Sequence, residues 1–214
     1  SERDLALQYN ISRMTARQAL SNLEREGFVE RIVGSGTFVT NRTIPFDFVE
    51  FASFTKNMKS KGLHPSTSPI YMRREPSNRF VSRMLRVSEG EEVLAIKRLR
   101  FADQFPVAVE LSYIPYVYCP GIEADMHEKD ASLYHVLEER FAIKLVRAEH
   151  TMRISLSDEE ESKLLRIEND SPCILVEAVA FEEEGKLIEF SQSLTRGDIS
   201  RFYFEVKIKN DSYM

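Results

Sequence analysis

No stretch of this 214-residue sequence approaches the roughly 20 consecutive apolar residues that a membrane-spanning helix needs. The N-terminus also lacks the basic-then-apolar pattern of a signal segment. Only two cysteines occur, Cys119 and Cys173, and neither has the close Cys or His neighbours that zinc or redox chemistry requires. We therefore expect a globular, cytoplasmic protein that crosses no membrane, binds no metal and carries no cofactor.

The net charge of -5 is unusual for a protein that binds nucleic acid, but this charge is unevenly distributed along the chain. Residues 1–43 hold six Arg and five acidic residues, which gives +1. Residues 44–214 hold 23 basic and 29 acidic residues, which gives -6. Only the first segment is therefore a plausible surface for the phosphates of a duplex.

Two short helices are predicted at the start of the chain. Ser1 stands three residues before Asp4, which is the capping-box pattern of a helix start, and this helix should reach about Tyr9. Ser12 is a second N-cap candidate, and the apolar residues after it recur at helical spacing up to Gly27. Two helices with so tight a connection predict a helix-turn-helix, whose second helix enters the major groove of DNA by its N-terminal end.

A β-hairpin is predicted directly after the helix pair, with strands at residues 28–33 and 37–40 and a Gly-Ser-Gly turn between them. Glycine at the tip allows positive φ and a close approach to another backbone. At the start of the second helix, Arg13 and Arg17 could read guanine or hold phosphate, and Thr15 could reach either. Each of these features is also common in proteins that do not bind DNA, so the prediction of a DNA-binding domain depends on their order and spacing.

Taken together, the quoted motifs resemble the winged-helix domain of the GntR family of bacterial regulators: Ser-Glu-Arg-Asp-Leu-Ala at 1–6, Ser-Arg-Met-Thr-Ala-Arg-Gln-Ala-Leu at 12–20, and Gly-Ser-Gly-Thr-Phe-Val at 34–39. The resemblance implies that the following residues contact operator DNA: Arg3, Arg13, Thr15, Arg17 and Gly34. The family's domain has a further helix upstream, so we expect about thirty preceding residues to be missing from this sequence.

Residues 47–210 are predicted to form a second domain, after a first domain at 1–41 and a linker at 42–46. Helices are expected at 50–61, 77–85, 133–140 and 158–166, and strands at 70–73, 93–101, 107–114, 145–154, 174–181, 187–194 and 202–208. Two pairs of strands are joined by tight turns, so the pattern predicts an α+β fold with an antiparallel sheet.

Strand alternation places polar side chains on faces that otherwise form a core. Arg98 and Arg100 share a face with apolar residues, and Glu189 and Ser191 share one on another strand. Glu110 on the partner strand could join Arg98, and Ser132 starts a helix, where anions bind. These rows predict an arginine-lined pocket for a phosphate or carboxylate, with solvent-facing ion pairs as an alternative of equal weight.

The order of elements resembles the UTRA effector domain of the HutC branch of the GntR family, which is related in fold to chorismate lyase. That resemblance implies that Arg98, Arg100 and Ser132 hold a phosphate while Glu110 and Glu189 hold a sugar. The remaining residues that we expect at the effector are Ser53, Phe54, Thr55, Tyr134 and Ser191. Thr195 stands where a tyrosine is common.

These observations favour a DNA-binding transcriptional regulator that is not an enzyme. We expect a homodimeric repressor, released from its operator by a small anionic metabolite such as a phosphorylated sugar. Two alternatives remain open, a chorismate lyase-like enzyme and a constitutive DNA-binding protein without effector.

Overall fold

The computed structural model describes residues 1–25, 28–39, 43–47, 53–126 and 132–203, and these form two units divided between Thr43 and Ile44. Unit 1 begins with α1 (Glu2–Gln8) and α2 (Arg13–Arg25). Ser1 and Asp4 form the expected capping box at the start of α1. Of the apolar residues that recur at helical spacing in α2, Ala16 and Leu20 are buried, whereas Ala19 and Leu23 are exposed. The expected end of this helix at Gly27 lies outside the described residues.

The predicted hairpin of unit 1 is formed by β1 (Val29–Ile32) and β2 (Gly36–Val39), which pair antiparallel from Val29↔Val39 to Ile32↔Gly36. Gly34 lies in the connecting turn with φ +80°, a backbone conformation that residues other than glycine rarely adopt. No atom lies within 4 Å of where a Cβ would stand, so backbone conformation and not crowding favours glycine here.

Unit 2 is built on a six-stranded antiparallel sheet with the strand order β4-β5-β6-β9-β8-β7. Its strands are β4 (Pro65–Pro76), β5 (Glu92–Ala102), β6 (Phe105–Pro115), β7 (Leu145–Leu156), β8 (Pro172–Glu182) and β9 (Leu187–Arg196). The expected strand at 70–73 is much longer in the structure, because β4 is an edge strand that tolerates Pro65 and Pro69.

The sheet consists of two equivalent halves. The elements β4, α4 (Arg79–Leu85) and β5 recur with unchanged lengths 80 residues later as β7, α7 (Glu159–Leu165) and β8. Arg86 and Arg166, which follow the two helices, both adopt the left-handed conformation. The halves meet where β6 pairs with β9, so strands of both halves contribute to each face at the centre of the sheet.

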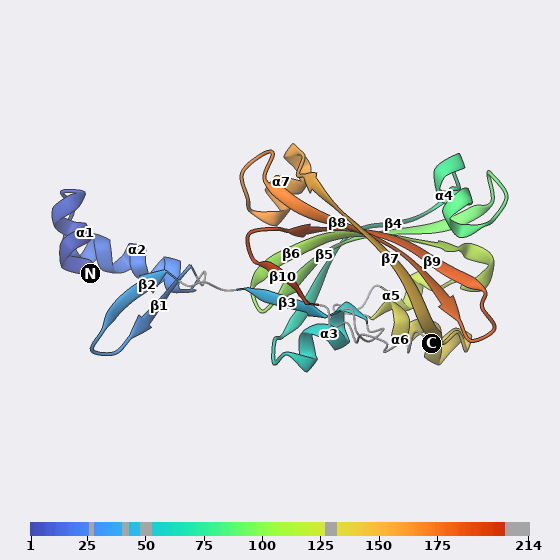
Figure 1. The fold of residues 1–214 in the computed structure, drawn as a ribbon, viewed down its shortest axis with the longest axis horizontal. Helices are drawn as coiled ribbons and strands as arrows, with labels where there is room; N and C mark the ends of the chain where they lie inside the picture. The colour runs from blue at the N-terminus through green and yellow to red at the C-terminus, as the bar shows by residue number, and fades with distance from the viewer. Residues whose placement is uncertain (26–27, 40–42, 48–52, 127–131, 204–214) are drawn as a thin grey trace, which may run out of the picture. The chain divides into compact units, whose positions relative to one another are not determined.

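Helices cover both faces of this sheet (Figure 1). One face, which we call the arginine face because Arg98 and Arg100 lie on it, packs against α3 (Phe54–Ser60), α5 (Glu123–Met126) and α6 (Leu133–Phe141), with a short 3-10 turn at Tyr116–Tyr118. On the opposite face, α4 and α7 bury Leu85 and Leu165 near the ends of the strands. Because side chains alternate between the two faces along each strand, the sheet has a separate apolar core on each face.

A separate two-stranded parallel ladder joins β3 (Ile44–Asp47) to β10 (Ser200–Tyr203). The expected linker at 42–46 overlaps β3, and the expected last strand begins two residues earlier than predicted. Its continuation at 204–208, and the start of the helix expected from Glu50, lie outside the described residues. The part of α3 that is described begins after Ser53, whose side chain caps it by accepting from Lys56 N.

Candidate effector cavity and DNA-binding surface

A cavity of about 190 Å³, which we call the central cavity, opens on the arginine face of unit 2. At about 30 Å³ per water molecule, this volume suits a small metabolite. Its lining comes from α3, α6 and strands of both sheet halves: Ser53, Phe54, Thr55, Asn57, Arg98, Arg100, Glu110, Ser132, Leu133, Tyr134, Ala148, His150, Val176, Ala178, Glu189, Ser191, Ser193, Thr195 and Phe202.

Two buried arginines dominate one end of the central cavity. Arg98 and Arg100 are only 2% and 6% exposed, and both guanidinium groups donate to Glu110 Oε1, Arg100 from Nη2 at 2.6 Å. Arg98 Nη2 also donates to Ser112 Oγ at 3.2 Å, and Arg100 Nη1 to Thr67 Oγ1 at 2.9 Å. The register of the hairpin places Arg98 directly opposite Glu110, the contact that sequence alone left unfixed.

Several N–H groups of this arginine pair are not used by the protein. Nε and Nη1 of Arg98 and Nε of Arg100 are buried and have no hydrogen-bond partner among the described residues. Buried polar groups are rarely left unpaired, because each costs a few kcal/mol. The unpaired donors on two cations therefore make this end of the cavity suited to an anion with several oxygens.

Charge balance in the cavity is set by the arginines. Burial opposes the ionisation of Glu110, but Arg100 and Arg98 outweigh it and lower its pKa to about 2. Burial and the neighbouring Arg100 lower the pKa of Arg98. With one carboxylate shared between two cations, the Arg98–Arg100–Glu110 cluster carries one net positive charge.

The other acid of the cavity, Glu189, is 3% exposed and has a different environment. Its Oε2 accepts from Tyr134 Oη at 2.8 Å. Burial, followed by the charge of Glu110, raises its pKa, while burial and Glu189 raise the pKa of Tyr134 well above its usual value. This pair, with the hydroxyls of Ser191 and Ser193 on the same strand, offers hydrogen-bonding groups for a neutral polar ligand such as a polyol.

Two helices begin at the central cavity, and their N-cap serines differ. Ser53 uses its hydroxyl to accept from Lys56 N at 3.3 Å. Ser132 occupies the N-cap position of α6 but makes no side-chain capping bond. Its hydroxyl lines the same cavity as the two arginines and is not used to cap the helix.

All ten residues that the sequence suggested for the effector line this one cavity. The sequence missed the other lining residues: Asn57, Leu133, Ala148, His150, Val176, Ala178, Ser193, Thr195 and Phe202. Ser193 shares the polar face of Glu189 and Ser191 in the sequence pattern although it was not assigned to the effector, and Thr195 continues the same alternation. Ala148, Val176 and Ala178 could not be predicted in this way, because the sequence does not distinguish a small apolar residue that lines a cavity from one that packs in a core.

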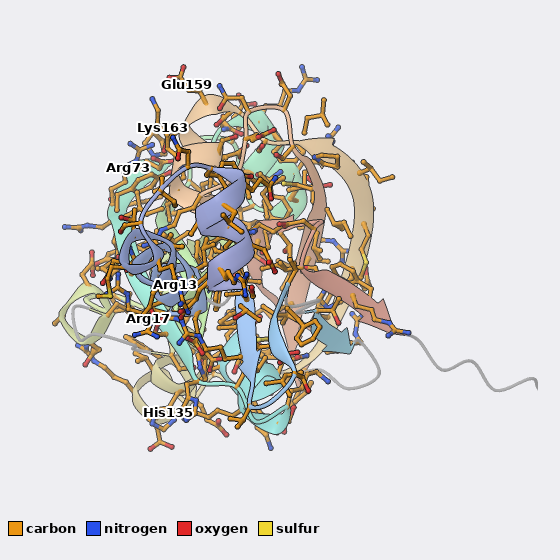
Figure 2. The ribbon with its side chains drawn as sticks, turned by 90° about the vertical axis from the view of Figure 1, so that its left-hand side faces the viewer. Arg13, Arg17, Arg73, His135, Glu159 and Lys163 are labelled. Carbon is orange, nitrogen blue, oxygen red and sulfur yellow. The ribbon has the colours of Figure 1, made fainter. Side chains whose placement is uncertain are left out.

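On unit 1, the side chains suggested for DNA are accessible. Arg3, Arg13, Thr15 and Gly34 are exposed, and Figure 2 shows Arg13 and Arg17 projecting from α2. Thr15 shares the start of this helix with Ser12, whose Oγ accepts from Thr15 N at 3.0 Å. Arg17 Nε donates to Glu2 at 3.1 Å, and this hydrogen bond lowers the pKa of Glu2.

Comparison with known proteins identifies both units. Residues 60–201 match the model of the UTRA domain, and residues 1–39 match that of the bacterial regulatory proteins of the gntR family. The chain belongs to the GntR family. As a GntR-family regulator it is a DNA-binding transcription factor and not an enzyme, and its α+β fold with a UTRA domain is the one predicted from the sequence.

Curated GntR relatives include the transcriptional repressor NagR of Bacillus subtilis, which is 33% identical over 92% of this chain and 81% of its own length. The mannosyl-D-glycerate transport/metabolism system repressor MngR of Escherichia coli is 26% identical over 94% of this chain and 83% of its own. Among solved structures, PhnF from Mycobacterium smegmatis superposes with a TM-score of 0.73 at 29% identity, covering 98% of this chain and 91% of its own. No helix in the described ranges is long and apolar enough to span a bilayer.

Proposed function

We propose that this protein is a homodimeric repressor that binds operator DNA through unit 1 and leaves it when a phosphorylated sugar enters the central cavity. The observation that carries the proposal is the pair of buried arginines with unpaired N–H groups in that cavity. A phosphate monoester has three terminal oxygens, which can accept from several of these donors at once. Because its partner is chromosomal DNA, we propose that it acts in the cytoplasm.

The sugar part of the ligand is proposed from the second group of polar side chains that line the cavity. Glu189, Tyr134, Ser191 and Ser193 supply acceptors and donors for hydroxyl groups. The names of relatives support this class, since they include repressors of mannosyl-D-glycerate metabolism and fructoselysine utilisation. Ser132 would add a hydroxyl to the phosphate, and Phe54 would cover the ligand from α3.

Operator binding is proposed to use the exposed start of α2 and the wing. Arg13 and Arg17 lie four residues apart on one side of the helix, so both can enter one major groove. Arg3 and the tip at Gly34 would contact the flanking backbone, and Thr15 a base or phosphate. A dimer would place two such helices about 34–36 Å apart on a two-fold symmetric operator.

The first experiment is a thermal-shift screen with glucose 6-phosphate, fructose 6-phosphate and other sugar phosphates, each beside its unphosphorylated sugar. A ligand that binds only the folded chain raises the melting temperature. A screening hit should then weaken binding to an operator selected from random DNA by about 5- to 150-fold.

The matched variant combines Arg98→Met, Arg100→Met and Glu110→Gln, which removes the three charges of the Arg98–Arg100–Glu110 cluster together and leaves none of these three unpaired. It should bind operator as the wild-type chain does but lose the response to the ligand. The exposed pair Arg73→Met and Arg74→Met serves as control. Tighter operator binding in the presence of the ligand would overturn release, and an unchanged response in the triple variant would overturn the assignment of the site.

A further inference from the structure

Ser112 lies where the two halves of the sheet meet, because it belongs to β6, which pairs with β5 of its own half and with β9 of the other. Its register partners are Ile96 on β5 and Ser191 on β9. Arg98 and Glu189 are therefore its diagonal neighbours on the arginine face, within reach of a side-chain contact. Ser112 itself is 0% exposed and does not line the central cavity.

The hydroxyl of Ser112 bonds to both of these charged neighbours. Arg98 Nη2 donates to Ser112 Oγ at 3.2 Å, and a guanidinium group can only donate. The single hydrogen of the hydroxyl therefore remains for another acceptor, and the carboxyl of Glu189 takes it. Burial raises the pKa of Glu189, and hydrogen bonds from Tyr134 and Ser112 oppose this rise. One hydroxyl thus joins a cation from the first half of the sheet to an acid from the second.

We propose that Ser112 is a positioning residue for the effector, because its hydroxyl holds Arg98 and Glu189 at a fixed spacing without contacting the ligand. This inference rests on the proposed function, in which the arginines bind the phosphate and Glu189 the sugar of one molecule. A ligand can contact both groups at once only where their spacing matches its own, so residues that fix the spacing contribute to affinity.

The contacts of Arg98 show what Ser112 adds. Within the described residues, Glu110 and Ser112 hold its guanidinium group, and both accept from the same nitrogen, Nη2. The remaining donors, Nε and Nη1, have no partner among the described residues and are left for an anion. Glu110 lines the cavity, as does Tyr134, the other donor to Glu189. Ser112 is thus the partner of both charged groups that a ligand does not contact.

The first test needs no ligand and measures the pKa of Glu189 in the full chain by carbon NMR of labelled glutamate side chains. Its signal is the one that Glu189→Gln removes. Ser112→Ala deletes the hydroxyl with little change in volume and should raise this pKa by about 1 unit or more, since a hydrogen bond to a charged group is lost. A serine that only packs in the sheet would leave the pKa unchanged.

The second test is calorimetric titration of the same chains with inorganic phosphate. Ser112→Ala leaves the guanidinium group of Arg98 with Glu110 alone and should weaken phosphate binding about 5-fold or more. Ser112→Thr retains the hydroxyl on a residue suited to strands, so both the phosphate affinity and the pKa of Glu189 should stay close to the wild-type values.

Ser162→Ala is the matched control for both measurements. Ser162 is also a buried serine, 1% exposed, and its hydroxyl bonds to Ser157 on the other side of the sheet from the cavity. It should change neither the pKa of Glu189 nor the phosphate affinity. An unchanged pKa of Glu189 in Ser112→Ala, or an unchanged affinity for inorganic phosphate, would overturn the positioning role.

These tests and those of the proposed function fail separately. A wild-type chain that binds neither inorganic phosphate nor a sugar phosphate contradicts the proposed function. The titration of Glu189 uses no ligand, so it still supports or overturns the contact that joins Arg98 to Glu189 through Ser112.

Discussion

At the scale of single residues, the main energetic feature is a carboxylate shared by two buried guanidinium groups. Removing three charges from water costs several kcal/mol per ion, and their mutual attraction repays this only when the network is complete. Glu110 is the centre of that network, because both Arg98 and Arg100 donate to its Oε1. Glu110 therefore positions the two arginines, whatever contact it also makes with a ligand.

Glu110→Gln should lower the free energy of unfolding by about 3 kcal/mol at pH 7, because it leaves two buried cations without a counter-ion. The folded pKa of about 2 lies below the ordinary value of 4.5, so the ionised Glu110 stabilises the fold above pH 4.5. That contribution is lost as the pH falls through 2. Urea unfolding should therefore show the difference between variant and wild type shrinking between pH 4.5 and 2.

Glu75→Gln is a suitable control, because Glu75 pairs with the exposed Arg73 and surface pairs contribute about 0–1 kcal/mol. An equal loss of stability in both variants would show that burial of the network has no special cost.

Sequence reasoning found the arginine end of the cavity because charge on an apolar strand face is rare. Arg98 and Arg100 alternate with core residues, so their side of β5 could be read from the pattern alone. The contact of Arg100 with Thr67 on β4 could not be predicted, because it depends on strand pairing and Thr67 lies outside the strand expected at 70–73. The place of the small residues of β7 and β8 in the cavity could not be predicted either, since only the folded sheet brings them there.

At the scale of elements, the two helices that begin at the central cavity have N-cap serines with different roles, one in helix stability and one proposed in ligand binding. The hydroxyl of Ser53 caps α3, whereas that of Ser132 makes no capping bond at α6. An N-cap hydroxyl contributes about 1 kcal/mol, and a hydrogen bond to a charged group about 1.5–3 kcal/mol.

Ser53→Ala should therefore lower the free energy of unfolding by about 1 kcal/mol in chemical denaturation. Ser132→Ala should change it by less than about 0.5 kcal/mol and weaken binding of the sugar phosphate about 10-fold or more in calorimetric titration. A destabilised Ser132→Ala with unchanged ligand affinity would assign this hydroxyl to the helix and not to the ligand.

At the scale of the whole molecule, the uneven charge of the sequence follows the division into units. Residues 1–43 carry +1 while residues 44–214 carry -6, so the part that matches the gntR model is also the part that a duplex does not repel. The larger unit has a negative total, yet the proposed anion site lies among its buried arginines, and local field rather than net charge determines binding in a cavity. Operator and effector can thus be bound by separate parts of one chain.

If effector and operator oppose each other through this chain, the coupling must be equal in both directions. An effector that weakens operator binding by a given factor between 5 and 150 requires that saturating operator weaken effector binding by that same factor. Titration of the ligand with and without the operator, beside titration of the operator with and without the ligand, measures both factors at one salt concentration. Unequal factors would mean that a third state, such as a dissociated dimer, enters the cycle. A ligand affinity unaffected by operator would show that the two units bind their partners independently.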